Sequence, residues 1–213
     1  MRVLIACEYS GRVREAFRKR GHYAWSCDIK PALDGSIFHQ ITDVRKLLCE
    51  HKFDMIIAFP PCTHLSSSGA RHWPEKRADG RQQDAINFFM NFANQACPWA
   101  IENPIGIMST AYRKPDQIIQ PYEFGDSAQK STCLWLSGLP KLVPTKIVSP
   151  GEMHILPDGR KFPKWMANKG AHRNITFQGI ADAMAAQWSS ARNHRNKPRK
   201  TNENLSCGPL LTP

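Results

Sequence analysis

One thiol stands directly after the most apolar stretch of the sequence. Residues 54–59 (DMIIAF) are unbroken in apolar character after Asp54, and they are followed by Pro60, Pro61 and Cys62. An apolar run of this length is typical of a strand covered on both faces, as in a parallel sheet. Because two prolines stiffen the backbone that follows, the sequence predicts a thiol held at the mouth of a buried strand.

A carboxyl group is predicted at a second strand end. Residues 99–102 form a short apolar run that ends at Glu102 and is followed by Asn103 and Pro104. A thiol near a carboxyl group suits covalent attack on an electron-poor ring, because the sulfur adds while the acid supplies or holds a proton. The alternatives are that Cys62 is a small buried apolar residue and that Glu102 pairs with an Arg or Lys.

Three further strand ends carry groups suited to a nucleoside. The apolar run 3–7 meets Glu8 and the turn to Gly11, where backbone N–H groups at a helix N-terminus can meet a ligand. Asp28 follows Gly11 by 17 residues, about where an acid binds ribose in a βαβ unit, and Asp43 ends the next segment. Each acid alone is more often a cap or a turn former. Together, at successive strand ends, they favour a binding site.

Strands and helices alternate along the chain. Apolar runs predict strands over 3–7, 23–29, 54–59, 99–102 and 132–136, with a shorter segment over 37–43. Helical spacing predicts helices over 13–20, 44–51, 81–95 and 179–191, with a loop over 63–80 and a turn at 157–159. This alternation favours an α/β fold with a mostly parallel sheet and helices on both faces.

Charge points to a polyanionic partner. The 213 residues carry a formal net charge of +11, and residues 192–200 (RNHRNKPRK) hold five basic residues and no acid. A basic body with a basic tail fits nucleic acid, although a solubilising surface would give the same composition.

Composition also excludes several classes. No apolar run approaches the ~20 residues that a membrane span needs, so we expect a soluble, cytoplasmic protein with no membrane partner. The seven cysteines include no CxxC pair, which argues against a disulfide framework. Cys62, His64 and His72 lack a fourth ligand at zinc spacing, so no metal is expected.

The motifs around the predicted nucleophile and acid resemble a known family. Residues 54–69 (DMIIAFPPCTHLSSSG) and 100–104 (AIENP) look like the nucleophile and proton-donor motifs of the cytosine-C5 methyltransferases. The Gly11 turn, Asp28 and Asp43 follow the order in which that family binds S-adenosylmethionine. Residues 178–184 (QGIADAM) resemble the helix motif that closes the cofactor pocket. Together these segments span residues 2–190.

The resemblance implies a Rossmann-like, class I S-adenosylmethionine-dependent methyltransferase that acts on C5 of cytosine in DNA. Cys62 would add to C6, Glu102 would protonate or hold N3, and Asn103 would fix the loop. Asp28 would hold the ribose, Asp43 the adenine amino group and residues 7–11 the methionine end. The implied cofactor residues are Cys7, Glu8, Tyr9, Ser10, Gly11, Asp28, Ile29, Asp43 and Pro60. The implied nucleic-acid contacts are Lys130, Arg192, Arg195, Lys197, Arg199 and Lys200.

Fewer than forty residues separate Leu136 from the closing motif near Arg173, where the family inserts a target-recognition domain. We therefore expect one catalytic domain over 1–191, a basic tail over 192–213, a monomer and weak reading of a duplex. The target base would be flipped out or single-stranded. Trp73 and Trp165, in polar and basic loops, are candidates for stacking on that base.

Three alternatives remain. The substrate could be a free pyrimidine nucleotide or a single-stranded nucleic acid. The reaction could be methylation of an exocyclic amino group, in which two prolines also follow a strand. The chain could also be a catalytically silent nucleic-acid-binding protein that keeps the fold.

Overall fold

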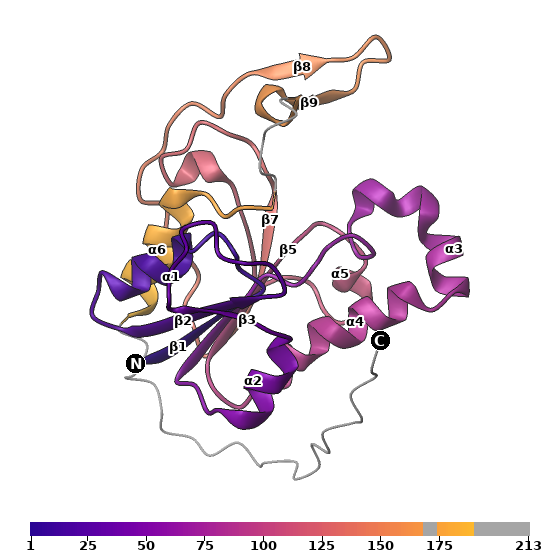
Figure 1. Cartoon of the computed structure of the whole chain (residues 1–213). Coiled ribbons are helices and arrows are strands. Elements are labelled where there is room, and N and C mark those ends of the chain that lie inside the picture. The colour runs from indigo at the N-terminus through magenta and orange to yellow at the C-terminus, as the bar shows by residue number, and fades with distance from the viewer. Residues whose placement is uncertain (168–173, 190–213) are drawn as a thin grey trace.

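The computed structural model describes residues 1–167 and 174–189, which form one seven-stranded sheet and a separate two-stranded hairpin (Figure 1). The main sheet has the order β3-β2-β1-β4-β5-β7-β6. Its parallel strands are β1 (Arg2–Ala6), β2 (Tyr23–Asp28), β3 (His39–Ile41), β4 (Met55–Ala58) and β5 (Trp99–Pro104). β7 (Thr132–Ser137) pairs antiparallel with β5 and with β6 (Gln117–Ile119).

Helices cover both faces of this sheet. α1 (Arg12–Arg18) and α6 (Gln178–Trp188) pack on one face, against Val3 and Ile5 of β1. α2 (Val44–Glu50) and α4 (Arg81–Ala93) pack on the other, against Leu4 and Ala6. Because successive side chains of a strand point to opposite faces, the apolar run of β1 serves both layers.

The Rossmann-like α/β fold predicted from the sequence is confirmed. The order of the first five strands agrees with that of doubly wound sheets. Successive strands are added on one side of β1 up to β3 and then, from β4 on, on its other side, so the order reverses between β1 and β4. Ligands bind such sheets beyond the carboxyl ends of the strands, at the point of reversal. The carboxyl ends of β1, β2 and β4 therefore lie side by side at one edge of the sheet. The candidate residues Asp28, at the end of β2, and Cys62, after β4, lie at this edge.

The prediction of a loop over residues 63–80 is wrong. This segment contains a 3-10 helix, η1 (Ser67–His72), followed directly by α3 (Trp73–Ala78). Pro74 lies in the first turn of α3, where its missing N–H costs no hydrogen bond, and good helix formers follow it. Four other short elements, which no periodicity reveals, are α5 (Met108–Ala111), β6 and the 3-10 helices η2 (Pro121–Glu123) and η3 (Lys164–Ala167).

The predicted turn at residues 157–159 joins β8 (Met153–Ile155) to β9 (Lys161–Pro163). This hairpin stands apart from the main sheet, at the top of Figure 1. At its base, the Trp165 indole N–H donates to the Gln129 carbonyl (3.2 Å), and its ring meets Phe177 edge-on. Trp165 thus anchors the hairpin to the loop that precedes β7.

The connection between β2 and β3 is a loop without a helix, and a buried arginine holds it in place. Arg14 is fully buried, donates to the Ser26 hydroxyl (2.8 Å) and pairs with Asp34 of that loop. Gly11 has a φ of 77°, and a Cβ there would collide with the Arg14 guanidinium and the Asp34 carboxylate. Gly11 is therefore required both by its conformation and by this contact.

Some predictions fall outside the described residues. The basic tail and the last residues of the predicted helix over 179–191 lie there, so the division at residue 191 stays a prediction. Among the helices of residues 1–167 and 174–189, none combines the length and apolarity that crossing a bilayer requires.

Gly179 tests the packing of α6 against the loop that follows η2. Its backbone N–H donates to the Asp126 carboxylate (2.9 Å), and a Cβ would overlap the Phe124 carbonyl group. We expect Gly179→Ala to lower the free energy of unfolding by about 1–3 kcal/mol, because backbone must move to admit the methyl group. Gly69→Ala is the control, since its Cβ would meet nothing closer than the Lys76 ammonium at 3.5 Å. Equal urea midpoints for the two variants would contradict the packing described.

Candidate functional site

A cavity of about 470 Å³ opens at the carboxyl ends of β1, β2 and β4. This volume lies in the range of small-molecule sites, roughly 300–1,000 Å³. The predicted residues Asp28, Asp43 and Cys62 all line it. The full lining is Cys7, Tyr9, Cys27, Asp28, Ile29, Lys30, Thr42, Asp43, Val44, Phe59, Pro61, Cys62, Thr63, Phe88 and Asn174.

The Cys62 loop is pinned by its carbonyl groups. The buried Asn103 donates from Nδ2 to the Pro60 carbonyl (2.8 Å), and Lys76 of α3 donates from Nζ to the Thr63 carbonyl (2.7 Å). The Cys62 carbonyl accepts from the N–H groups of residues 65 and 66. The loop is thus fixed from β5, from α3 and from its own turn, while the Cys62 residue itself stays exposed.

Cys62 lies within the electrostatic reach of Glu102 and Lys130. Although the residue as a whole is exposed, partial burial of its sulfur and the negative charge of Glu102 raise the pKa of the Cys62 thiol, while the Lys130 ammonium lowers it. Burial raises the pKa of Glu102 as well, and Lys130 again opposes the shift. Glu102 therefore keeps its proton to a higher pH than an ordinary glutamate, which suits a proton donor.

The Asn103 side chain places a second polar atom, its Oδ1, beside Glu102 and the Cys62 loop. Its Oδ1 is buried and has no hydrogen-bond partner among the residues that the structure describes. Its Nδ2 also contacts the Glu102 carbonyl (3.2 Å), so the same amide links the acid's backbone with the Cys62 loop. A buried carbonyl oxygen left unpaired costs about 1–3 kcal/mol unless a ligand or water donates to it.

The two aspartates differ in how far their oxygens are engaged. One oxygen of Asp28 accepts from the Lys30 N–H (3.0 Å). Asp43 is the N-cap of α2, accepts from the Arg45 N–H (2.9 Å) and pairs with the Arg45 guanidinium. Hydrogen bonds from the Arg45 side chain hold the pKa of Asp43 below its ordinary value. The Asp43 carboxylate is thus engaged in capping α2 and in pairing with Arg45. Asp28 is the better acceptor for a ligand hydroxyl.

In the turn after β1, the Glu8 side chain binds the helix N-terminus at which the sequence predicted a ligand. Glu8 is buried, and its Oε1 accepts from the Ser10 hydroxyl and from the Val13 N–H at the start of α1 (both 2.9 Å). Burial raises the pKa of Glu8. Cys7, with a φ of 58°, and Tyr9 line the cavity, whereas Glu8, Ser10, Gly11 and Pro60 are not among its lining residues.

Three thiols line the cavity, and only one is exposed. Cys27 is buried and Cys7 is half-buried, whereas Cys62 is exposed. Burial raises the pKa of Cys27 to about 12 and raises that of Cys7 strongly. Because the thiolate is the reactive form, Cys7 and Cys27 are poor nucleophiles and Cys62 is the candidate.

The sequence did not reveal several lining residues. Asn174 accepts from the Tyr9 hydroxyl (3.1 Å) and so closes the cavity from a segment 165 residues away. The Lys30 ammonium lies 5.3 Å from the centre of the Tyr9 ring. Phe88 of α4 also reaches the cavity. The one sequence signal for Asn174 is that it lies shortly before the motif at 178–184.

The remaining predicted residues that the structure describes do not line the cavity. Glu102 and Lys130 act on the Cys62 thiol through their charges, and Asn103 bonds to the Pro60 carbonyl. Trp73 begins α3, half-buried, with the Arg77 guanidinium 5.8 Å from its ring. The tail residues Arg192, Arg195, Lys197, Arg199 and Lys200 lie outside the described residues, as does Arg173. Within residues 1–167 and 174–189, no three His, Cys, Asp or Glu side chains gather as metal ligands would.

Comparisons with known proteins give likenesses to solved structures alone. No family model matches the chain, and no curated protein matches it. A solved structure of a provisionally assigned DNA modification methyltransferase, encoded within a prophage of E. coli, is 16% identical, with a TM-score of 0.47. The match covers 69% of this chain and 51% of that one, so this chain spans about half the length of that protein. A likeness at this level assigns no activity.

The electrostatic arrangement predicts how Cys62 reacts. We expect iodoacetamide to alkylate Cys62 with a pH midpoint above the ~8.5 of a free thiol, because burial and Glu102 both disfavour the thiolate. Glu102→Gln should lower that midpoint and Lys130→Ala should raise it, as peptide mapping by mass spectrometry will measure. The exposed Cys49 of α2 is the internal control. A Cys62 midpoint that responds to neither substitution would contradict the arrangement.

Proposed function

We propose that this chain transfers a methyl group from S-adenosylmethionine to C5 of cytosine in DNA, through a covalent adduct on Cys62. One observation carries the proposal: a single cavity joins the strand-end acid Asp28 to an exposed thiol that Glu102 and Lys130 both influence. The residue types and their order resemble the cytosine-C5 methyltransferases, which supports the same conclusion.

The residues of the cavity fit the cofactor. The cavity lies where the strand order reverses, which is where doubly wound sheets bind nucleotides. Asp28 would accept from the ribose hydroxyls, while Ile29 and Phe88 offer apolar surface to a purine ring. The turn at Cys7 and Tyr9 would meet the methionine end. When bound, S-adenosylmethionine supplies an electrophilic methyl carbon attached to a positively charged sulfur.

The chain's own groups would then carry the chemistry on cytosine. Cys62 loses its proton, and its sulfur bonds to C6 of the base. Glu102 delivers a proton to N3, which takes up the electron pair displaced from the 5,6 double bond. The neutral enamine that results is nucleophilic at C5 and accepts the methyl group. Water would take up the C5 proton, Glu102 would take back the N3 proton, and the 5,6 double bond would re-form as the Cys62 sulfur leaves with the electrons of the C–S bond.

Two groups would support these steps. Lys130 opposes the negative charge that Glu102 and the Cys62 thiolate would otherwise share, so it favours the reactive form of the thiol. Asn103 ties the backbone beside Glu102 to the Cys62 loop and so sets the separation of acid and nucleophile. In a duplex, the base must leave the stack to reach either group.

A second candidate substrate is a free pyrimidine nucleotide or a single strand. Between β7 and α6, the described residues hold only the small β8–β9 hairpin and η3 as regular structure. Such a short segment offers little surface for reading a duplex. A third candidate is a catalytically silent nucleic-acid-binding protein. It is favoured because Glu8 already binds the N-terminus of α1 and Arg45 already pairs with Asp43, so both groups are engaged without a cofactor. Calorimetry with S-adenosylmethionine separates this candidate, since a silent protein gives no heat.

An adduct tests the nucleophile. We expect the protein and S-adenosylmethionine to form a denaturant-stable complex with DNA that contains 5-fluorocytosine, because fluorine at C5 cannot leave as a proton does. The complex should disappear in Cys62→Ala and persist in Cys49→Ala, as gel electrophoresis and intact-mass measurement will show. Duplex DNA, single-stranded DNA and dCMP, each with labelled cofactor, identify the substrate. An adduct that survives in Cys62→Ala would disprove the assignment.

The basic tail should contribute to affinity rather than to chemistry. We expect truncation before Arg192 to weaken binding to duplex DNA and to flatten its salt dependence, by up to about 4 in the slope of log K against log salt. Methyl transfer at saturating substrate should not change. Binding that is identical with and without residues 192–213 across a salt series would remove the tail from the account.

A further inference from the structure

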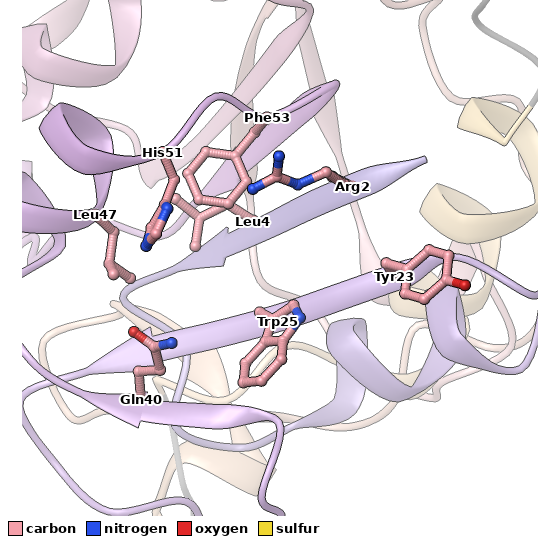
Figure 2. Close-up of a pocket in the computed structure, with 8 residues that line it drawn as sticks. All are labelled: Arg2, Leu4, Tyr23, Trp25, Gln40, Leu47, His51 and Phe53. Atoms are coloured by element: carbon pink, nitrogen blue, oxygen red, sulfur yellow. The ribbon is translucent and has the colours of Figure 1, made fainter.

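A second concave site lies far from Cys62, towards the amino ends of β1 and β2. It is a groove of about 470 Å³ beside α2 (Figure 2). Leu4 of β1 lies at its floor, and His51 and Phe53, which follow α2, lie on the opposite side from Tyr23 and Trp25 of β2. The methyl-transfer scheme uses none of these residues.

Two aromatic side chains stand along one edge of the groove. Tyr23 and Trp25 are two residues apart on β2 and thus point to the same face of the sheet. Their exposed fractions are 72% and 36%, which is unusual for side chains of this size. Phe38 meets Trp25 edge-on at 5.5 Å and holds it from the side. Paired aromatic residues on an open sheet are a platform on which successive unpaired bases stack.

The facing wall carries a guanidinium and an imidazole. The Arg2 guanidinium lies 6.0 Å from the centre of the Phe53 ring, and the His51 imidazole meets that ring edge-on. No acidic residue is among those that line the groove. Two acids flank these residues along the chain: Glu50 ends α2, and Asp54 accepts a hydrogen bond from the Arg2 backbone N–H (2.8 Å). The Arg2 guanidinium opposite an aromatic platform complements a ligand that has flat rings on one side and negative charge on the other.

We propose that this groove binds a single strand of nucleic acid, with successive bases on Tyr23 and Trp25 and the intervening phosphate towards Arg2 and His51. A duplex is excluded, since its bases are already stacked and paired. A protein helix is disfavoured, because such a partner needs a continuous apolar wall and this wall carries a guanidinium and an imidazole. The net charge of +11 adds a general attraction for the same ligand. The proposal goes beyond the proposed transfer reaction and does not depend on it.

The test is fluorescence anisotropy of labelled oligo-dT (12 nucleotides) with the full chain. Oligo-dT contains no cytosine, so a failed transfer reaction leaves the measurement intact. We expect the double variant Tyr23→Ala/Trp25→Ala to bind about tenfold more weakly or worse, and Trp25→Phe to keep most of the affinity. Arg2→Ala should weaken binding and reduce the salt slope by about 0.7.

Matched controls lie on and near the opposite edge of the sheet. Ile118→Ala removes an exposed apolar side chain from β6, and Lys114→Ala removes an exposed charge. Both should bind oligo-dT within twofold of the unaltered chain. A duplex of the same length should lose less than twofold in the double variant. If the double variant fails to fold, Tyr23→Ala alone, at the more exposed position, carries the test.

Three outcomes would overturn the proposal. One is unchanged oligo-dT affinity in the double variant or, in the alternative case, in Tyr23→Ala. Another is an equal loss for duplex and single strand, which would indicate general charge attraction. The third is self-association of the unaltered chain, measured by sedimentation, that the double variant abolishes without changing oligo-dT affinity. That last result would make the groove a protein interface.

Discussion

The parallel pairing of β1 with β2 on one side and β4 on the other is the constraint on which the site depends. Three strands that run the same way end at the same edge, and the chain must leave that edge in opposite directions on either side of β1. The space left between these departing segments is the cavity that holds Asp28 and Cys62. Burial of Val3, Leu4, Ile5 and Ala6 between two helical layers fixes the register, since a shift by one residue would exchange the two faces.

Polar contacts refine what the sheet has placed. The Cys62 loop has little regular structure of its own, and Asn103 and Lys76 hold it through carbonyl groups. Each such bond contributes about 1 kcal/mol net, but losing its donor would leave a carbonyl oxygen unsatisfied. The same pattern appears at the β2–β3 loop, where Arg14 reaches Asp34 under Gly11. Single long side chains thus take the place of helices or glycine-rich turns at two points around the cavity.

Much of the fold could be predicted from the sequence because its strands are continuous apolar runs. β4 and β5, buried on both faces, were found within two residues of their bounds. The loop prediction over residues 63–80 failed because η1 and α3 are short and lack an apolar stripe, and Lys76 binds them to the Thr63 carbonyl. β6 has three residues and exists through its pairing with β7, which no local pattern shows. For the site, strand ends indicated Asp28, Asp43 and Cys62, which line one cavity, but Asn174 and Lys30 are tertiary neighbours of Tyr9. Nor could spacing show that Glu8 turns inward to cap α1.

The central claim is that one cavity brings a nucleoside cofactor and the Cys62 thiol together. A crystal structure of the chain soaked with S-adenosylhomocysteine tests this claim most directly. The account predicts that the ribose hydroxyls lie against the Asp28 carboxylate and that the homocysteine sulfur faces Cys62 across a space wide enough for one pyrimidine. Cofactor bound elsewhere on the sheet, or no binding at millimolar concentration, would contradict it.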